Sequence, residues 1–147
     1  KHKIHYSLFF YGTLRASEVR KAVLGENIKY HETTNGFLTH YKVFQVKDAN
    51  YPLIKFTNNE EDVVQGLLIS NISLNELNKL DKFEGINYFR QYVKINVAGK
   101  LYDSQIYIPD KNLLHSEPWD YEKWYNNDMQ SFFNNEFDLN GVKEIKN

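Results

Sequence analysis

The chain contains no cysteine and only three prolines among its 147 residues, and its net charge is −1. Without cysteine it has no disulfide framework, no thiolate zinc site and no cysteine nucleophile. No apolar run approaches the roughly 20 residues that a membrane-spanning helix needs. The balanced charge provides no basic stripe of the kind that binds nucleic acid. We therefore expect a cytoplasmic protein that binds neither nucleic acid nor membranes.

Motifs for common cofactors and nucleophiles are missing as well. The five histidines are scattered, and neither a His-x-His nor a His-Glu-x-x-His spacing occurs. No glycine-rich loop of the nucleotide-binding types is present, and no Gly-x-Ser-x-Gly turn presents a serine nucleophile. The sequence therefore predicts no metal and no cofactor.

What the chain does contain is an apolar strand that ends in a glycine. Residues 6–11 form the apolar run, and Gly12 follows directly. Because glycine lacks a Cβ atom, the chain can turn sharply there and its backbone can approach a ligand. The backbone N–H groups of Gly12, Thr13 and Leu14 are then suited to hold a carboxylate or a phosphate. An ordinary strand–turn–helix corner is the alternative explanation of the same segment.

A second segment places an acidic residue on the apolar face of a helix. Ser73 and Glu76 form a capping box that begins this helix, and Gly85 ends it. Three leucines form the predicted apolar stripe: Leu74, Leu77 and Leu80. At about 100° per residue, Glu84 falls near the centre of that stripe. The pattern therefore predicts that Glu84 points inward.

An inward carboxylate must be paired, hydrogen-bonded or left partly neutral with a raised pKa. A raised pKa is what a general base needs near neutral pH, whereas a buried salt bridge would make Glu84 purely structural. Asp81 leans toward the same stripe. It either raises the pKa of Glu84 further or forms an ion pair with Arg90.

The remaining chain reads as short strands followed by one more helix. The predicted strands cover residues 36–46, 51–56, 63–69, 88–97 and 101–108. Because helices do not alternate regularly with them, a curved and largely closed sheet is favoured over a Rossmann sheet. Aromatic residues at helical spacing predict a C-terminal helix at about 118–133, followed by a polar tail. We interpret this helix as a cover of the sheet, with a lid or an interface as alternatives, and residues 1–147 as a single domain.

Four motifs occur in a fixed order within residues 6–109. They are Phe10-Tyr11-Gly12-Thr13-Leu14, Tyr51-Pro52-Leu53-Ile54, Leu80-Asp81-Lys82-Phe83-Glu84-Gly85 and Tyr88-Phe89-Arg90. Together they resemble the gamma-glutamylcyclotransferase-like superfamily, nearest its gamma-glutamylamine cyclotransferase branch. The resemblance implies an α+β fold, a small mixed β-barrel with flanking helices.

The resemblance also implies a reaction that uses no cofactor. A small gamma-glutamyl amine or peptide would be cleaved when its own α-amine attacks the γ-carbonyl, and 5-oxoproline would be released by this acyltransferase or lyase chemistry. The implied site consists of Glu84 as the acid/base residue and, for the substrate, Tyr11, Gly12, Thr13, Leu14, Tyr51 and Tyr107.

Two of these assignments carry further interpretations. Tyr107 would donate a hydrogen bond to the substrate carboxylate or to the developing oxyanion. Tyr51 precedes a proline, a pair that also simply marks the start of a strand. The alternative functions are a non-catalytic binding protein for a carboxylate metabolite and an acyl-removing enzyme of biosynthetic tailoring.

Overall fold

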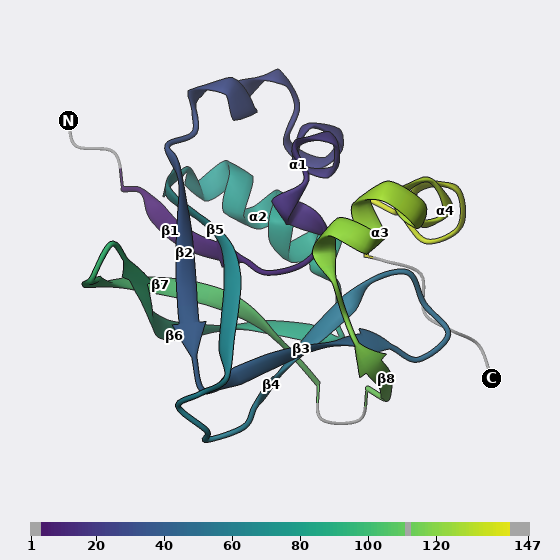
Figure 1. The fold of residues 1–147 in the computed structure, drawn as a ribbon. Coiled ribbons are helices and arrows are strands. Elements are labelled where there is room, and N and C mark those ends of the chain that lie inside the picture. Colours follow the sequence, from purple (N-terminus) through teal and green to yellow (C-terminus); the bar gives the residue numbers. More distant parts are fainter. Residues whose placement is uncertain (1–3, 111–112, 142–147) are drawn as a thin grey trace.

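The computed structural model describes residues 4–110 and 113–141, and its centre is a closed five-stranded barrel (Figure 1). The barrel strands, in order around it, are β1 (Tyr6–Phe10), β5 (Val63–Ile72), β2 (Thr33–Thr39), β6 (Tyr88–Val97) and β7 (Lys100–Pro109). Strands β1 and β7 run parallel, and the other neighbours run antiparallel. The predicted small mixed β-barrel with flanking helices is confirmed.

A second sheet of three antiparallel strands adjoins the barrel. Its order is β4 (Pro52–Phe56), β3 (Tyr41–Val46) and β8 (His115–Pro118). The prediction of one strand over residues 36–46 is wrong, because His40 adopts a φ of 75° and separates β2 from β3. The two halves of that segment thereby enter different sheets. Strand β8 was not predicted.

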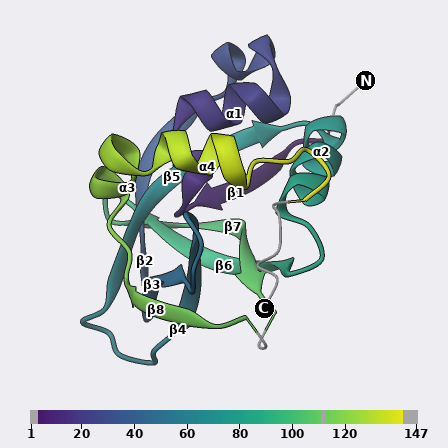
Figure 2. The ribbon, with the colours of Figure 1, turned by 90° about the vertical axis from the view of Figure 1, so that its right-hand side faces the viewer.

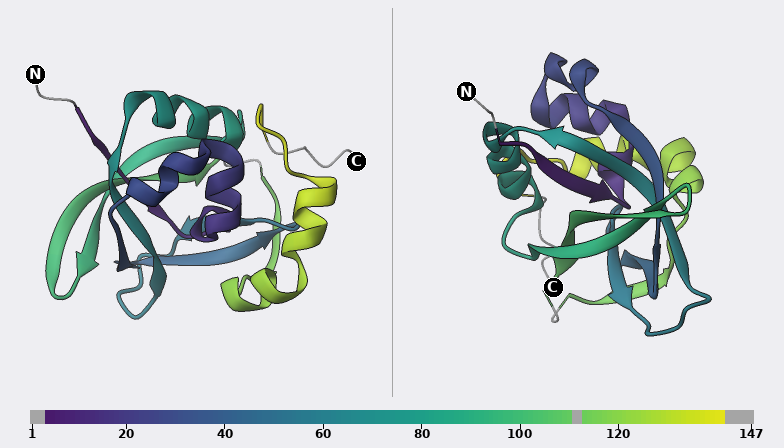
Figure 3. Two further views of the ribbon diagram at one scale, coloured as in Figure 1. Left: turned by 90° about the horizontal axis from the view of Figure 1, so that it is seen from above. Right: turned by 90° about the vertical axis from the view of Figure 1, so that its left-hand side faces the viewer.

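Four α-helices gather toward one side of the barrel (Figures 1 and 3). They are α1 (Ser17–Leu24), α2 (Leu74–Glu84), α3 (Tyr121–Asn127) and α4 (Met129–Asn135). Two 3-10 helices, η1 (Thr13–Arg15) and η2 (Glu26–Tyr30), flank α1. Figure 2 shows α1, α3 and α4 above the strands, and the Tyr125 hydroxyl of α3 donates a hydrogen bond to Glu18 of α1. Within residues 4–110 and 113–141, none of the helices combines the length and the apolar character needed to cross a membrane.

Helix α2 begins and ends as the sequence predicts. The Ser73 Oγ accepts a hydrogen bond from the Glu76 N–H at 3.2 Å, and the Glu76 Oε1 accepts one from the Ser73 N–H at 3.0 Å. At the other end Gly85 has a φ of 79°, a left-handed conformation that favours glycine. These two caps fix Glu84 as the last helical residue.

The apolar stripe of α2 differs from the prediction at one position. Leu77, Leu80 and Phe83 are buried, but Leu74 is 56% exposed. Each step of three residues rotates by about 60° around the helix, so Leu74 lies about 120° from Leu80 while Glu84 lies only about 40° from it. Phe83 lies about 60° from Leu80 on the side opposite Leu77, so the buried face is centred on Leu80 and Glu84 still falls within it.

The C-terminal segment forms two helices rather than the single predicted one. Asp120 caps α3, accepting hydrogen bonds from the Glu122 and Lys123 N–H groups at 2.9 and 3.3 Å. Trp124 and Phe132 are fully buried, so this segment covers the barrel and contributes to its core. The predicted polar tail is buried in part, at Glu136, and its residues 142–147 lie outside the described residues.

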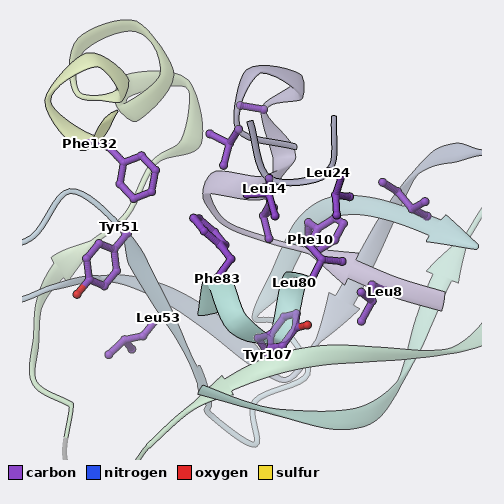
Figure 4. Packing of buried hydrophobic residues seen from close by; sticks show 14 of the residues in the cluster. Leu8, Phe10, Leu14, Leu24, Tyr51, Leu53, Leu80, Phe83, Tyr107 and Phe132 are labelled. Carbon is purple, nitrogen blue, oxygen red and sulfur yellow. The ribbon is translucent and has the colours of Figure 1, made fainter. Parts of the chain in front are cut away.

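Phe132 joins the C-terminal segment to the rest of the core. Figure 4 shows its ring near those of Tyr51 and Phe83, with centroid separations of 6.4 and 6.5 Å. Both contacts are edge-on, a favourable geometry for aromatic pairs. These rings belong to one of two clusters of buried residues, and the second cluster includes Phe9 and Ile95. The assignment of residues 1–147 to a single domain stays a prediction.

The Phe132→Ala substitution should lower the free energy of unfolding by about 3 to 5 kcal/mol, because it leaves a cavity among these rings. Denaturant titration measures this loss. The matched control is Phe89→Ala, since Phe89 is 54% exposed and its loss should stay near 0.5 kcal/mol, about the value for surface positions. Equal losses in the two variants would contradict the assigned packing.

Candidate active site

A pocket opens where the ends of β1 and α2 meet strands β4, β6 and β7. It is lined by Phe9, Phe10, Tyr11, Gly12, Thr13, Leu14, Tyr51, Pro52, Phe83, Glu84, Tyr88 and Tyr107. The centre of a water molecule has about 40 Å³ in which to move, whereas a single water needs only about 10 to 15 Å³. The pocket therefore admits a narrow chain. All seven residues predicted for the site lie on its wall, and their roles remain predictions.

Glu84 brings a carboxyl group into this pocket. Its helical neighbours Leu80 and Phe83 are buried, while Glu84 itself is half-buried and lines the cavity. No hydrogen bond or ion pair reaches its carboxyl group from residues 4–110 and 113–141. Burial, and secondly the negative charge of Asp81, raise the pKa of Glu84 to about 8. At neutral pH this group therefore exchanges protons readily.

Asp81 lies one turn before Glu84 and is held by two residues. The Arg90 guanidinium donates to both of its carboxyl oxygens, at 2.9 and 3.2 Å. The Tyr107 hydroxyl donates to Oδ1 at 2.7 Å, and Arg90 also donates to Gln105 Oε1 at 2.7 Å. Both alternatives for Asp81 therefore hold at once, because it pairs with Arg90 and still raises the pKa of Glu84. Arg90 is thereby directed to Asp81 and away from Glu84.

The tyrosines of the wall donate to protein groups. The Tyr11 hydroxyl donates to the Tyr107 carbonyl at 2.8 Å, and the Tyr88 hydroxyl donates to the Pro52 carbonyl at 2.9 Å. The Tyr107 hydroxyl donates its proton to Asp81 in this structure, and a hydrogen bond from Tyr107 to a substrate stays a prediction. Burial raises the phenol pKa of all three tyrosines, and the charge of Glu84 raises each further. They are neutral at physiological pH.

Gly12 is required for a different reason from the one expected. Its φ of −119° is open to any residue, so no left-handed turn occurs. A Cβ atom at this position would lie 2.8 Å from Cγ of Pro52, however, and the proline ring has little freedom to move away. The missing side chain therefore allows β1 to approach the start of β4, which brings two walls of the pocket together.

The η1 turn follows Gly12 and is held in place by the side chain of Arg20. The Arg20 Nη1 donates to the carbonyls of Leu14 and Arg15, at 2.9 and 2.7 Å. Within the described ranges, no hydrogen bond is donated by the backbone N–H groups of residues 12–14. These three groups therefore remain available to an acceptor in the pocket.

Tyr51 is positioned by the C-terminal segment through its neighbour Asn50. The Glu136 carboxylate accepts hydrogen bonds from the Asn50 N–H at 2.6 Å and from its Nδ2 at 3.0 Å. The Trp124 Nε1 donates to the Asn50 carbonyl at 2.6 Å. These partners are 74 and 86 residues away in sequence, so no local pattern could have indicated them.

Five residues of the pocket wall were not assigned to the site from the sequence: Phe9, Phe10, Pro52, Phe83 and Tyr88. For Tyr88 a signal existed, because it opens the fourth motif two residues before Arg90. In Phe83 the signal was the helical spacing from Leu77 and Leu80.

Comparison with known proteins gives consistent matches. The family model described as "Gamma-glutamyl cyclotransferase, AIG2-like" matches residues 8–126. AIG2-like protein D of Arabidopsis thaliana is 28% identical over 134 residues, which cover 86% of this chain and 84% of that protein. AIG2-like protein C of the same organism is 29% identical over 135 residues, which cover 88% of this chain and 75% of that protein.

Solved structures resemble the fold. A solution structure of an Arabidopsis thaliana protein has a TM-score of 0.66 at 22% identity and covers 91% of this chain, with 82% of its own chain matched. The crystal structure of an AIG2-like protein from Mus musculus has a TM-score of 0.59 at 20% identity, covering 81% of this chain and 90% of its own. At these identities the likeness concerns the fold alone.

We expect the carboxyl group of Glu84 to titrate near pH 8. Carbon-13 NMR of labelled glutamate, assigned with the Glu84→Gln variant, measures this pKa. Asp81→Asn should lower it by about one unit or more, because the substitution removes a negative charge and frees the charge of Arg90.

The matched control is Asp103→Asn, in which the lost carboxylate belongs to an exposed pair with Lys94 on the β6–β7 hairpin. This control should leave the titration of Glu84 unchanged. A Glu84 pKa near 4.5 in the parent protein, or an unaltered pKa in Asp81→Asn, would refute the electrostatic account.

Proposed function

Since the chain belongs to the gamma-glutamyl cyclotransferase, AIG2-like family, we propose that it cleaves a gamma-glutamyl amine or peptide and releases 5-oxoproline. The observation that carries this proposal is Glu84, a carboxyl group with a pKa of about 8 on the wall of a narrow pocket. The proposed substrate is a small molecule, and the proposed chemistry uses only side chains and backbone of this chain.

Substrate binding would begin with the α-carboxylate of the glutamyl group. We assign it to the backbone N–H groups of residues 12–14, which line the pocket and are suited to hold an anion. Arg20 supports this assignment, because its guanidinium fixes the η1 turn from behind and adds a positive charge near the bound anion. The γ-carbonyl would then curl back toward the α-amine.

Glu84 would act first as a base. In its ionised form it takes a proton from the α-ammonium group, and the freed amine attacks the γ-carbonyl carbon of the same molecule. A new C–N bond closes a five-membered ring. Because the pKa of Glu84 is about 8, it lies much closer to that of an amine than an ordinary carboxyl pKa does, which lowers the free-energy cost of this proton transfer.

Glu84 would then act as an acid. The bond between the γ-carbon and the leaving nitrogen breaks as that nitrogen receives a proton from the carboxyl group, and the resulting carboxylate takes the extra proton of the ring nitrogen. The released amine then accepts this proton from Glu84, so the products are 5-oxoproline and an ammonium ion, and Glu84 returns to its ionised starting state. A carboxylate with an ordinary pKa would be too weak a base to take this proton from the ammonium group in the first step.

Orientation contributes the other part of the rate enhancement. Attack within one molecule needs the amine held against the carbonyl, which can contribute about 7 to 11 kcal/mol in favourable cases. The aromatic wall formed by Tyr51, Phe83 and Tyr88 suits this purpose, since it confines the methylene chain between the two ends of the glutamyl group.

Glu84→Gln should reduce 5-oxoproline release from gamma-glutamyl compounds by about 100- to 10,000-fold, the usual range for loss of a general acid–base group. The amide keeps the shape of the side chain but cannot carry the proton. Release is measured by chromatography with a panel of gamma-glutamyl amines and peptides.

The control is Glu60→Gln, which makes the same chemical change at an exposed position and should keep the parental rate. Release by Glu84→Gln at the parental rate would contradict the assignment. A parent protein that binds gamma-glutamyl compounds but releases no 5-oxoproline would instead be the carboxylate-binding protein of the alternative hypothesis.

A further inference from the structure

An open groove of about 450 Å³ lies between the start of α3, the η1 turn and the strands β3 and β5. Pockets that bind small molecules usually have volumes of about 300 to 1,000 Å³. Within the described ranges, Tyr11 is the only residue that lines both this groove and the pocket of Glu84, so the two are separate sites. The side chains of its wall that matter for binding are Arg15, Lys42, Trp119, Asp120, Tyr121 and Glu122.

The groove exists because two strands end before their neighbours do. Strand β1 ends at Phe10, which pairs with Leu67, so in the described part of the chain residues 63–66 of β5 pair only with β2. Pairing of β8 with β3 stops at Phe44 in the same way. A gap therefore remains between the barrel and the second sheet, and the chain enters α3 beside it.

Aromatic rings form a preformed apolar wall of the groove. The Trp119 and Tyr121 rings are half-buried, and their centroids lie 6.1 Å apart. Each also lies 6.0 Å from the ring of Trp124, which is fully buried behind them. The Trp119 N–H donates to the Val43 carbonyl at 3.0 Å, which ties this wall to β3. The rings can therefore receive an apolar group without first having to be ordered.

Charged groups of both signs line the groove without pairing with one another. The Arg15 guanidinium lies over the Tyr121 ring, with Cζ 4.0 Å from the ring centroid. From residues 4–110 and 113–141, neither a hydrogen bond nor an ion pair reaches the side chains of Arg15, Lys42 and Glu122. Asp120 accepts only from backbone N–H groups, as the cap of α3. A guanidinium stacked on a ring keeps the N–H donors in its plane for an acceptor.

We propose that this groove is a second ligand site, which binds a free α-amino acid with an aromatic or large apolar side chain. The carboxylate would pair with the Arg15 guanidinium, the ammonium group with Glu122, and the side chain would pack on Trp119. A ligand with only a negative charge would be repelled by the two acids, and one with only a positive charge by the two bases. This site does not depend on catalysis by Glu84 and goes beyond the proposed function.

The test uses L-phenylalanine and two analogues that each lack one charge. The compound 3-phenylpropionate has no ammonium group, and 2-phenylethylamine has no carboxylate. Binding is measured by the change in tryptophan fluorescence, because Trp119 and Trp124 are the only two tryptophans and Trp124 is 1% exposed. Trp119→Phe should abolish this signal. The parent protein should bind L-phenylalanine at least about tenfold more tightly than 2-phenylethylamine, and several-fold more tightly than 3-phenylpropionate.

Two variants should lose different ligands. Arg15→Gln removes the partner of the carboxylate, so it should weaken L-phenylalanine and 3-phenylpropionate about tenfold or more and spare 2-phenylethylamine. Glu122→Gln removes the partner of the ammonium group, so it should weaken L-phenylalanine and 2-phenylethylamine several-fold and spare 3-phenylpropionate. A merely structural role of either residue would instead weaken all three ligands together.

The matched control is Lys100→Gln, which removes a positive charge at an exposed position of the β6–β7 hairpin. This hairpin lies on the side of the barrel away from α3 (Figures 1 and 3), so all three affinities should stay unchanged. Thermal unfolding checks that each variant is folded.

Three results would overturn the amino-acid site. They are equal affinities of the parent protein for the three ligands, no change in fluorescence at about 10 mM L-phenylalanine, and a loss of L-phenylalanine binding in Glu84→Gln as large as in Arg15→Gln. The last result would place the amino acid in the catalytic pocket. Release of 5-oxoproline is not measured here, so the outcome leaves the cyclotransferase proposal to its own test.

Discussion

The carboxyl group of Glu84 enters a narrow pocket in which it forms no ion pair with the part of the chain that the structure describes, and this arrangement has a cost in stability. Its pKa is about 8 in the folded protein against an ordinary value of 4.5. The folded state therefore binds more protons than the unfolded state between these values, so this group favours folding fully below pH 4.5 and loses that contribution as the pH rises through 8. The proposed chemistry needs the ionised form of Glu84. Favourable interactions elsewhere in the fold must offset the free-energy cost of this ionised form.

Several features of the fold hold Glu84 in that position. The capping box at Ser73 and the left-handed Gly85 fix both ends of α2, and the burial of Leu80 and Phe83 sets its rotation. The Arg90 guanidinium is bound to Asp81 and Gln105 rather than to Glu84. The C-terminal segment closes the far side, since Phe132 packs on Phe83. The pocket thus places the Glu84 carboxyl group among buried aromatic side chains.

The sequence allowed the parts of this arrangement that depend on local geometry to be predicted. Helical rotation and two caps were enough to point Glu84 inward, and the motif order indicated the barrel. Contacts between residues far apart in sequence could not be predicted. Asn50 is held by hydrogen bonds to Glu136, and the Tyr107 hydroxyl reaches Asp81 only because β7 pairs with β6. His40 adopts a positive φ without any glycine to signal the break between β2 and β3. Leu74 was wrongly assigned to the buried stripe, because two steps of three residues already rotate it by about 120° from Leu80.

The central claim is that the proton carried by Glu84 is the one transferred in the reaction. The pH dependence of 5-oxoproline release at low substrate concentration tests this most directly, when compared with the NMR titration of Glu84 in the same buffer. The account predicts a rate that rises with pH and a midpoint near 8 that coincides with the titration of Glu84. A rate that is constant from about pH 6 to 9, or a midpoint near the ordinary glutamate pKa of about 4.3, would contradict it.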